Sequence, residues 1–480
     1  MRAIGIIASD STENDARVIL NEGEEKRVRA EDLVLVENRN EGKILAVLRR
    51  GLGSNENLKP GGYHPGVAYA RIGGRPSMAK ETYDFALSVI GETGEAIQQN
   101  KKILAPGSLV QIFEDNDDPM QYLARKKNGS TLGHYEGQCS WEVPVDCSFI
   151  SYHLGIFAST GGGKSFLARH QMIPLLQKAG YSVLVLDWKG RDYAPHYPKE
   201  NVISISEIAL DTETVAGYLV EKMKNFGYSA YSGGNVTQAV EEYIDGQKWR
   251  GLSLTEFRYV LEHSIVNELN PTQLKSGRAF EEEQRFKRGL RRLKDTDIQN
   301  ILGTITVQDI LNLVREKGIL IVDMKRTGSD EKLSMFLTFA NYIKELMQND
   351  EDIDLALLID EAPQYCPFRP GGIQEQTTDI IIDLCALGRT HKLSICLLSQ
   401  GIAGEIGINA AVRRNLNTQF VGKIHPLDMN EASSWLSPFN IDAKFLLSLP
   451  PGHFFLMGSM NPSPIPLLLT FEIPPDGKHQ

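Results

Sequence analysis

Residues 158–165 read ASTGGGKS and stand between an apolar stretch, residues 153–157 (HLGIF), and a helix-periodic segment, residues 166–179. This order of strand, glycine-rich loop and helix is typical of a loop whose backbone N–H groups point at phosphate oxygens. The usual pattern is broken at one position, because Ala158 stands where a first glycine is expected. Three consecutive glycines can still adopt the required backbone angles. A plain glycine-rich turn is the alternative, which the Lys-Ser pair in register disfavours.

The loop predicts ATP and Mg²⁺ as ligands. Lys164 is expected to contact the β- and γ-phosphates and Ser165 to coordinate Mg²⁺, while the following helix N-terminus favours an anion. The residues predicted to bind the nucleotide in and around the loop are Thr160, Gly161, Gly162, Gly163, Lys164, Ser165 and Phe166.

A second motif, residues 355–361 (LALLIDE), is an apolar run that ends in two carboxylates. At the carboxyl edge of a parallel sheet, such side chains can reach a bound metal. We expect Asp360 to hold Mg²⁺ through water and Glu361 to orient or deprotonate the attacking water. Alone, the run would more often be a solvated strand end, but the upstream loop favours the catalytic interpretation.

Two further polar residues end apolar strands at the same predicted edge. Asp187 follows residues 182–186 and either supports the metal or nucleotide or simply caps the strand. Gln400 follows residues 393–399 and either senses the γ-phosphate or lies in an ordinary loop. Both alternatives stay open for each residue.

Three arginines are candidates for the cation that stabilises a transferring phosphoryl group, which a neighbouring subunit often supplies. Arg389 lies in the sequence LGRTH, and Arg413 and Arg414 are adjacent. Since most arginines are only surface charges, the sequence does not choose among them.

The bulk charge gives no support for nucleic-acid binding. The net charge is −10, so any DNA contact must come from a local basic feature. A basic cluster at largely helical spacing comprises Arg285, Lys287, Arg288, Arg291, Arg292 and Lys294. The neighbouring glutamates 281–283 make a charge-paired, solvated helix the favoured interpretation of this cluster.

The strand and helix pattern predicts an α/β protein with a parallel sheet covered by helices, preceded by a small β-barrel or sandwich. In the N-terminal part we expect strands at residues 3–7, 32–36, 43–47, 66–71 and 109–113, and a helix at residues 80–90. The predicted domains are a barrel, 1–142, an ATPase core in two parts, 143–204 and 318–480, and a helical insertion between them, 205–317.

Composition indicates a protein without a membrane span or disulfide framework. The longest apolar stretches, such as residues 355–359, are only of strand length, and the apolar run in residues 1–7 is too short for a signal peptide. The 5 cysteines show no close CxxC pair. We therefore expect a cytoplasmic protein with reduced thiols and no membrane partner.

The ordered motifs resemble the HerA family of hexameric ATPases, within the HerA–FtsK group of DNA-pumping motors. Besides the barrel, the strand-end acid and the helical insertion, the resemblance rests on VPV at 143–145, HLGI at 153–156, IDEA at 359–362, LGR at 387–389 and LLSQ at 397–400. The order of these motifs is more specific than any one of them.

The resemblance implies a RecA-like P-loop core with a HAS-barrel-like N-terminal domain. It also implies a homohexameric ring around double-stranded DNA, with Lys164 and Ser165 on nucleotide and Mg²⁺ and with Asp360 and Glu361 on metal and water. Gln400 would be the sensor and Arg389 the leading trans-acting arginine finger. A nuclease, NurA in archaeal relatives, would dock on the barrel, and the pair would resect DNA ends for recombinational repair.

Several positions depart from the family pattern. Besides Ala158, Gly162 stands where relatives often have Ser, and Tyr152 precedes His153 where an Arg-His pair is common. The segment WKG at 188–190 also differs. Alternative functions are therefore a HerA-like scaffold or regulator of an effector enzyme in an antiviral complex and, less favoured, a secretion or conjugation ATPase.

Overall fold

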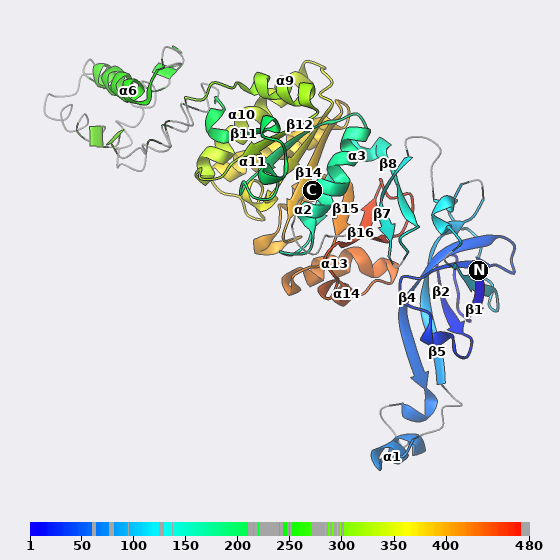
Figure 1. Ribbon diagram of the computed structural model, residues 1–480. Helices are drawn as coiled ribbons and strands as arrows, with labels where there is room; N and C mark the ends of the chain where they lie inside the picture. The colour runs from blue at the N-terminus through cyan, green and yellow to red at the C-terminus, as the bar shows by residue number, and fades with distance from the viewer. Residues whose placement is uncertain are drawn as a thin grey trace.

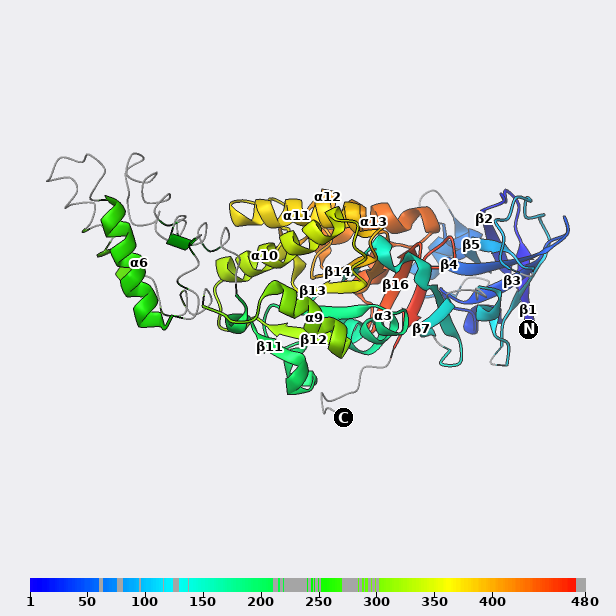
Figure 2. The ribbon, with the colours of Figure 1, turned by 90° about the horizontal axis from the view of Figure 1, so that it is seen from above.

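The computed structural model describes residues 1–59, 64–75, 81–94, 96–114, 116–123, 129–136, 138–209, 252–269 and 302–471, with scattered positions in 215–249 and 284–298. A β-barrel lies at one end of the molecule, and a large sheet with helices on both faces forms its middle (Figures 1 and 2). Helix α6 (Leu254–Leu269) lies at the end opposite the barrel.

The barrel is closed by six antiparallel strands. In spatial order they are β1 (Arg2–Ile7), β2 (Asp15–Leu20), β5 (Glu81–Glu92), β4 (Lys43–Asn55), β3 (Leu33–Glu37) and β6 (Leu109–Ile112). Because side chains alternate along a strand, Val34 and Val36 fill the barrel interior. Leu33 and Leu35 point to the other side, where they join the core of the large sheet. The barrel therefore packs against the rest of the chain through an apolar face.

Two predictions in this region were wrong. The helix predicted at residues 80–90 was wrong, because residues 81–90 lie in strand β5. Both faces of this strand are covered, which masks the period-2 pattern: Leu87 packs inside the barrel and Ile90 in the core of the large sheet. Residues 66–71 form helix α1 (Pro65–Arg71) and not a strand. Pro65 occupies the first helical turn, where its fixed φ angle is favourable and its missing N–H costs nothing.

The large sheet has eleven strands and mixed direction. Its strands, in spatial order, are β11 (Val202–Ser204), β12 (Ile319–Asp323), β10 (Ser182–Asp187), β13 (Leu355–Ile359), β14 (Leu393–Ser399), β9 (Leu154–Phe157), β15 (Thr418–Val421), β16 (His453–Gly458), β17 (Leu467–Thr470), β7 (Gly129–Tyr135) and β8 (Glu142–Asp146). The strands from β11 to β15 are parallel, and those beyond β15 are antiparallel. The predicted parallel sheet is thus present, with an antiparallel extension toward the barrel.

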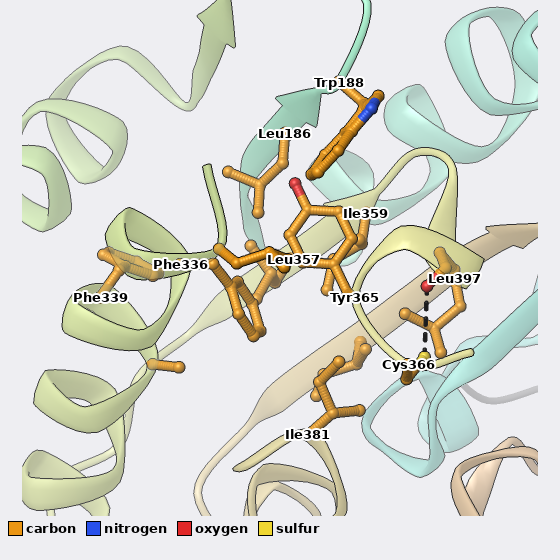
Figure 3. Packing of buried hydrophobic residues seen from close by; sticks show 14 of the residues in the cluster. Leu186, Trp188, Phe336, Phe339, Leu357, Ile359, Tyr365, Cys366, Ile381 and Leu397 are labelled. Carbon is orange, nitrogen blue, oxygen red and sulfur yellow. Dashed lines mark hydrogen bonds between the residues drawn. The ribbon is translucent and has the colours of Figure 1, made fainter. Parts of the chain in front are cut away.

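Both faces of the parallel part are buried, which explains the continuous apolar strands. In β13, Leu357 and Ile359 face one apolar cluster, whereas Leu358 faces another. Helices α9 (Val307–Lys317), α10 (Ser329–Gln348) and α11 (Ile373–Gly388) supply the first cluster. The other cluster includes side chains of α2 (Lys164–Leu167) and α3 (Ile173–Lys178). Figure 3 shows part of the first cluster, with the residues around Tyr365 packed between strands and helices.

Strand pairing bears on the domain division. Strand β7 lies inside the segment 1–142 that we assign to the barrel, yet it pairs with β17 and β8 of the large sheet. Helix α9 lies inside the segment 205–317 but packs on β10 and β12. We propose that the barrel ends before β7 and that the insertion ends before α9.

The part of the insertion that the structure describes contains helix α6, with Phe257 and Leu261 buried on one face. Most of residues 210–251 and 270–301, and with them Arg285, Arg292 and Lys294 of the basic cluster, lie outside the described residues. Within the cluster, Lys287 lies 3.7 Å from Glu262, which fits the charge-paired interpretation of that lysine.

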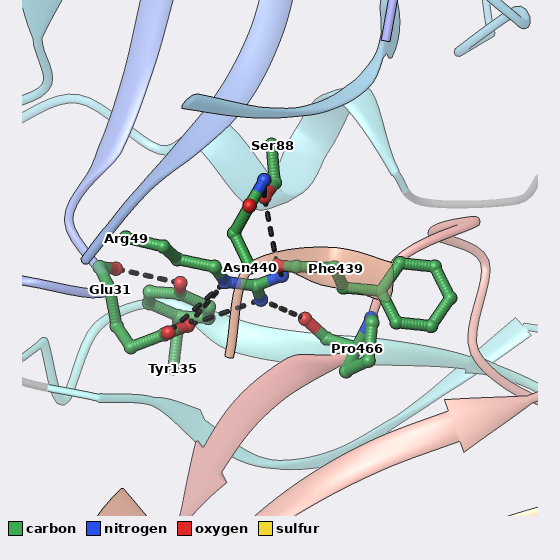
Figure 4. A network of polar contacts seen from close by, with 7 residues as sticks. All are labelled: Glu31, Arg49, Ser88, Tyr135, Phe439, Asn440 and Pro466. Carbon is green, nitrogen blue, oxygen red and sulfur yellow. Dashed lines mark hydrogen bonds and ion pairs between the residues drawn. The ribbon is translucent and has the colours of Figure 1, made fainter. Parts of the chain in front are cut away.

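A buried ion pair joins the barrel to the C-terminal part of the large domain (Figure 4). Arg49, only 1% exposed, donates to Glu31 at 3.1 Å and to the carbonyl oxygens of Phe439 (2.8 Å) and Pro466 (2.6 Å). Burial raises the pKa of Glu31, whereas the charge and hydrogen bond of Arg49 oppose that shift. The hydroxyl of Tyr135 donates to the Glu31 carbonyl at 2.7 Å, so one network holds together three segments distant in sequence.

Candidate active site

The glycine-rich loop joins β9 to α2 at the carboxyl edge of the sheet. Gly161 (φ 78°) and Gly163 (φ 99°) have left-handed backbone angles, which a residue with a Cβ atom adopts only with strain. Around Gly161 there is open space, since a Cβ atom there would have no neighbour within 4 Å. The loop is therefore shaped by its glycines and leaves room for a ligand at Gly161.

Ala158 and Gly162 are coupled inside this loop. A Cβ atom on residue 162 would lie 2.9 Å from the Cβ atom of Ala158 and 3.0 Å from the carbonyl oxygen of Ser159. Such a contact is too short for two carbon atoms, so a side chain at 162 requires a smaller residue at 158. The two departures from the usual pattern thus compensate for each other.

Lys164 begins helix α2 and turns back over the loop. Its ammonium donates to the carbonyl oxygen of Ala158 at 2.6 Å. Burial lowers the pKa of Lys164, while the charges of Asp360 and Glu361 oppose that shift. A cation among two carboxylates at a phosphate-shaped loop fits the predicted contact with nucleotide phosphates.

The side chains of the next two residues have different surroundings. Ser165 lies in the first turn of α2, as a ligand of a phosphate-bound metal requires. The ring of Phe166 stacks on His170 (centroids 5.2 Å apart), and the guanidinium of Arg169 lies 4.8 Å from its centroid. Nucleotide binding by Phe166 stays a prediction.

Asp360 has surroundings that suit a cation ligand. It is 4% exposed, and its Oδ2 atom has no hydrogen-bond partner among the described residues. Burial, together with the charges of Glu361, Asp192 and Asp187, raises the pKa of Asp360 to about 7. Carboxylate oxygens of Asp360, Asp187 and Asp192 lie within 4.8 Å of one another, a donor set that suits Mg²⁺.

Asp187 has a structural task of its own. Its carboxylate accepts backbone N–H groups from Gly190 (2.9 Å), Tyr193 (3.0 Å) and Ala194 (3.0 Å). These bonds fix the loop that follows β10. The strand-cap interpretation therefore describes Asp187 here, and its contact with a metal or nucleotide stays a prediction.

Glu361 is held from two sides directly after the apolar strand. Its backbone is left-handed (φ 52°), a conformation that costs energy in a residue other than glycine. The amide of Gln400 donates to both of its carboxylate oxygens, at 2.8 and 3.0 Å, and the ammonium of Lys189 pairs with Oε1. Thr160 in turn donates to Gln400 Oε1 at 2.9 Å. A polar chain thus connects the glycine-rich loop to the carboxylate that would activate water.

Comparison with known proteins identifies this domain. Residues 130–343 match the family model described as "Helicase HerA, central domain". This part of the chain is similar to the central domain of HerA and is called HerA-type for that similarity. The match supports the P-loop ATPase that the resemblance of the motifs implied. No curated protein matches the chain in sequence.

The solved structures that resemble this chain have low sequence identity to it. VirB4 of Thermoanaerobacter pseudethanolicus is 15% identical, with a TM-score of 0.49 over 73% of this chain and 98% of that one. The bacterial conjugative coupling protein TrwBdeltaN70 is 13% identical, with a TM-score of 0.46 over 77% and 94%. The genome packaging NTPase B204 from Sulfolobus turreted icosahedral virus 2 is 12% identical, with a TM-score of 0.34 over 67% and 98%.

The candidate arginines do not enter the site of their own HerA-type domain. Arg389 and Tyr152 both precede parallel strands and lie at the sheet edge opposite the glycine-rich loop, with the guanidinium 5.3 Å from the tyrosine ring centroid. Arg413 donates to the Ile402 carbonyl (2.8 Å) and pairs with Glu431 (3.0 Å). Arg414 is exposed. Only action on a neighbouring subunit would give Arg389 a catalytic task.

Sequence reasoning did not assign Lys189 or Asp192 to the HerA-type site. Lys189 follows the strand-end acid Asp187 by two residues, which puts it at the carboxyl edge of the sheet. That position was the available signal. Its pairing with Glu361 depends on β10 and β13 being neighbours, which the sequence does not state.

Proposed function

We propose that the chain hydrolyses ATP with Mg²⁺ and uses the energy to translocate double-stranded DNA as a homohexameric ring. The observation that carries the proposal is the polar chain from Thr160 through Gln400 to Glu361, which links the phosphate loop of a HerA-type domain to its catalytic carboxylate. The same proposal includes a NurA-like nuclease partner in DNA end resection in the cytoplasm. Among the helices of the described residues, none has the length and hydropathy of a membrane span.

The residues of the site support one reaction. Lys164 binds the β- and γ-phosphates of ATP, while Ser165 and Asp360 would hold Mg²⁺, which when bound neutralises phosphate charge. Glu361 accepts a proton from a water molecule whose oxygen attacks the γ-phosphorus. The bond from that phosphorus to the β–γ bridging oxygen breaks, and ADP and phosphate are formed. Gln400 keeps the carboxylate oriented toward the water.

Lys164→Ala tests the chemistry together with the motor function. Wild-type protein should hydrolyse ATP faster when duplex DNA is present, and Lys164→Ala should abolish hydrolysis with and without DNA. Lys178→Ala is the matched control, because this lysine lies at the far end of the same helical segment, where its ammonium donates to the Ser130 hydroxyl. ATP hydrolysis that DNA does not stimulate, with no translocation at any salt concentration, would overturn the motor proposal.

Mixed rings test the trans-acting role of Arg389. A subunit with Lys164→Ala lacks its own phosphate contact but still offers Arg389 to its neighbour. Mixing it with an Arg389→Ala subunit should therefore restore part of the ATPase activity that each variant alone lacks. An unchanged, inactive mixture would exclude Arg389 as the arginine finger, and Arg414→Ala would then be mixed in the same way.

A second candidate function is a HerA-like scaffold that switches an effector enzyme in an antiviral complex. The departures at Ala158, Gly162 and Lys189 favour it, because they alter the loop and the carboxylate on which a fast motor depends. A co-purified partner enzyme that keeps full activity with Glu361→Gln would support the scaffold. Loss of all function with that substitution would support the motor.

A further inference from the structure

A basic pocket lies beside the ATPase site. It has a volume of about 500 Å³ and lies between the segments that follow β10 and β12. It is lined by Trp188, Lys189, Arg191, Lys325, Arg326 and Lys332. Five of these six residues are cations and none is an acid, in a chain whose net charge is −10. Such local excess of positive charge attracts a polyanion.

The cations differ in how far they are neutralised. Lys325 lies 2.5 Å from Asp323, and Lys189 pairs with Glu361. Arg191 and Arg326, in contrast, are exposed, and no acidic side chain in the described part of the chain forms an ion pair with either. Two guanidinium groups are therefore free to bind phosphate oxygens, which match their planar donor geometry.

One side of the pocket is formed by a buried side chain with fixed contacts. Lys332 is 7% exposed, donates to the Trp188 carbonyl oxygen at 2.7 Å and lies 4.3 Å from the centroid of the Trp188 ring. Burial lowers the pKa of Lys332, whereas the charges of Asp187, Asp323 and Glu331 oppose that shift. This lysine is held in place by the indole and lines the pocket, where an anion would stabilise its charge.

The pocket shares a wall with the catalytic site. The Trp188 ring packs edge-on against Tyr365, four residues after Glu361, with centroids 5.1 Å apart (Figure 3). Lys189 lines the pocket and also pairs with Glu361. Although burial lowers it, the pKa of Lys189 is raised overall by its hydrogen bond to Glu361. An anion in the pocket would compete with Glu361 for this ammonium.

We propose that the pocket binds the phosphodiester backbone of DNA and that binding draws Lys189 away from Glu361, which activates ATP hydrolysis. Without DNA, the ammonium occupies the carboxylate oxygen that would accept the proton of water. With DNA, phosphate oxygens take over Lys189, and Glu361 keeps only its bonds to Gln400. This inference rests on the proposed DNA motor and adds the route by which DNA regulates it.

Variants in the full chain separate the two parts of the proposal. Lys189→Ala should raise the turnover number without DNA several-fold, leave the KM for ATP unchanged and reduce the stimulation by DNA. Lys189→Arg keeps a cation at this position and should restore low basal turnover.

Arg191→Ala and Arg326→Ala should keep wild-type basal turnover and bind duplex DNA more weakly. Each should reduce the slope of log K against log salt by about 1. Arg27→Ala, an exposed arginine on the barrel, is the control.

Each outcome decides a different question. If Lys189→Ala lowers basal turnover, the ion pair supports catalysis and the proposed inhibition is wrong. If inorganic phosphate or polyphosphate stimulates hydrolysis as strongly as duplex DNA, the pocket takes free phosphate and the DNA assignment is wrong. If the wild type binds DNA but Arg191→Ala and Arg326→Ala bind it equally well, only this inference fails. If the wild type neither binds DNA nor responds to it, the proposed function fails first.

Discussion

The Cβ atom of Ala158 lies 2.9 Å from the point that a Cβ atom on Gly162 would occupy. The two residues stand at the two positions where the phosphate loop departs from the usual pattern, and each restricts the other. Glycine at 158 would remove the shorter of the two close contacts that a side chain at 162 makes, while the 3.0 Å contact with the Ser159 carbonyl oxygen would remain. A loop with alanine at 158 and a larger residue at 162 would have to move its backbone.

This coupling predicts a rescue within the phosphate loop. Gly162→Ser alone should weaken ATP binding by about fivefold or more, because shifting the loop backbone costs roughly 1–3 kcal/mol. Adding Ala158→Gly should restore part of the affinity, which nucleotide titration of the single and double variants would measure. Ala158→Gly alone is the control. Equal affinity for the single Gly162→Ser variant and the double variant would show that the two positions are independent.

Asp360 predicts a pH dependence of stability in the absence of metal and nucleotide. Its pKa is about 7 in the folded chain against 3.8 for the free side chain, so the folded state holds a proton that the unfolded chain has released. The stability from this group is therefore present at low pH and is lost as the pH rises through about 7. The loss amounts to at most about 4 kcal/mol.

Denaturant unfolding from about pH 4 to pH 8 tests this prediction when wild type and Asp360→Asn are compared. The free energy of unfolding of the wild type should fall relative to that of the variant as the pH rises, because the amide does not titrate. Adding Mg²⁺ with ATP should stabilise the wild type most at the higher pH, where Asp360 is charged. A pH-independent difference between the two proteins would contradict the burial argument.

Gln400 should act through the orientation of Glu361. Gln400→Ala removes both hydrogen bonds to the carboxylate. Misplacing a catalytic group can cost up to about 100-fold in rate. We expect the turnover number to fall toward that limit while ATP affinity, set by Lys164 and the glycines, changes little. Steady-state kinetics with a separate binding titration distinguishes the two quantities, and Gln177→Ala on α3 is the control. An equal loss of affinity and turnover would assign Gln400 to binding instead.

The ion pair of Arg49 with Glu31 predicts a large cost for breaking it. Arg49→Ala leaves Glu31 buried without its partner and should destabilise the protein by about 3–5 kcal/mol. Arg49→Met combined with Glu31→Gln removes both charges and should cost less than Arg49→Ala. Arg17→Ala breaks the pair with Asp84, in which Arg17 is 44% exposed, and should cost no more than about 1 kcal/mol. Thermal unfolding of the four proteins would establish the order.

The sequence was sufficient for those parts of the fold where local pattern and tertiary environment agree. The apolar runs that became β10, β13 and β14 are buried on both faces, and length and composition marked them as strands. Strand β5 could not be recognised, because the barrel covers one face and the rest of the chain the other, which removes the alternation.

The catalytic edge was predictable only in part. The positions of Lys164, Asp360 and Glu361 follow from where strands end, and the structure brings all three together. The order of the strands in space does not follow from sequence, and it is this order that puts Lys189 beside Glu361. Likewise, nothing in the local sequence indicates that the Asp187 carboxylate would accept hydrogen bonds from three backbone N–H groups.

The core that the barrel shares with the C-terminal strands also affects how the chain can fold during its synthesis. All six barrel strands lie within residues 2–112 and can close early. Their outward apolar residues, Leu35 and Val47 among them, are covered by a core that includes Phe454 and Leu469. Until those residues have been synthesised, the barrel exposes an apolar surface that is prone to aggregation. We therefore expect nascent chains stalled before β16 to bind chaperones at this face.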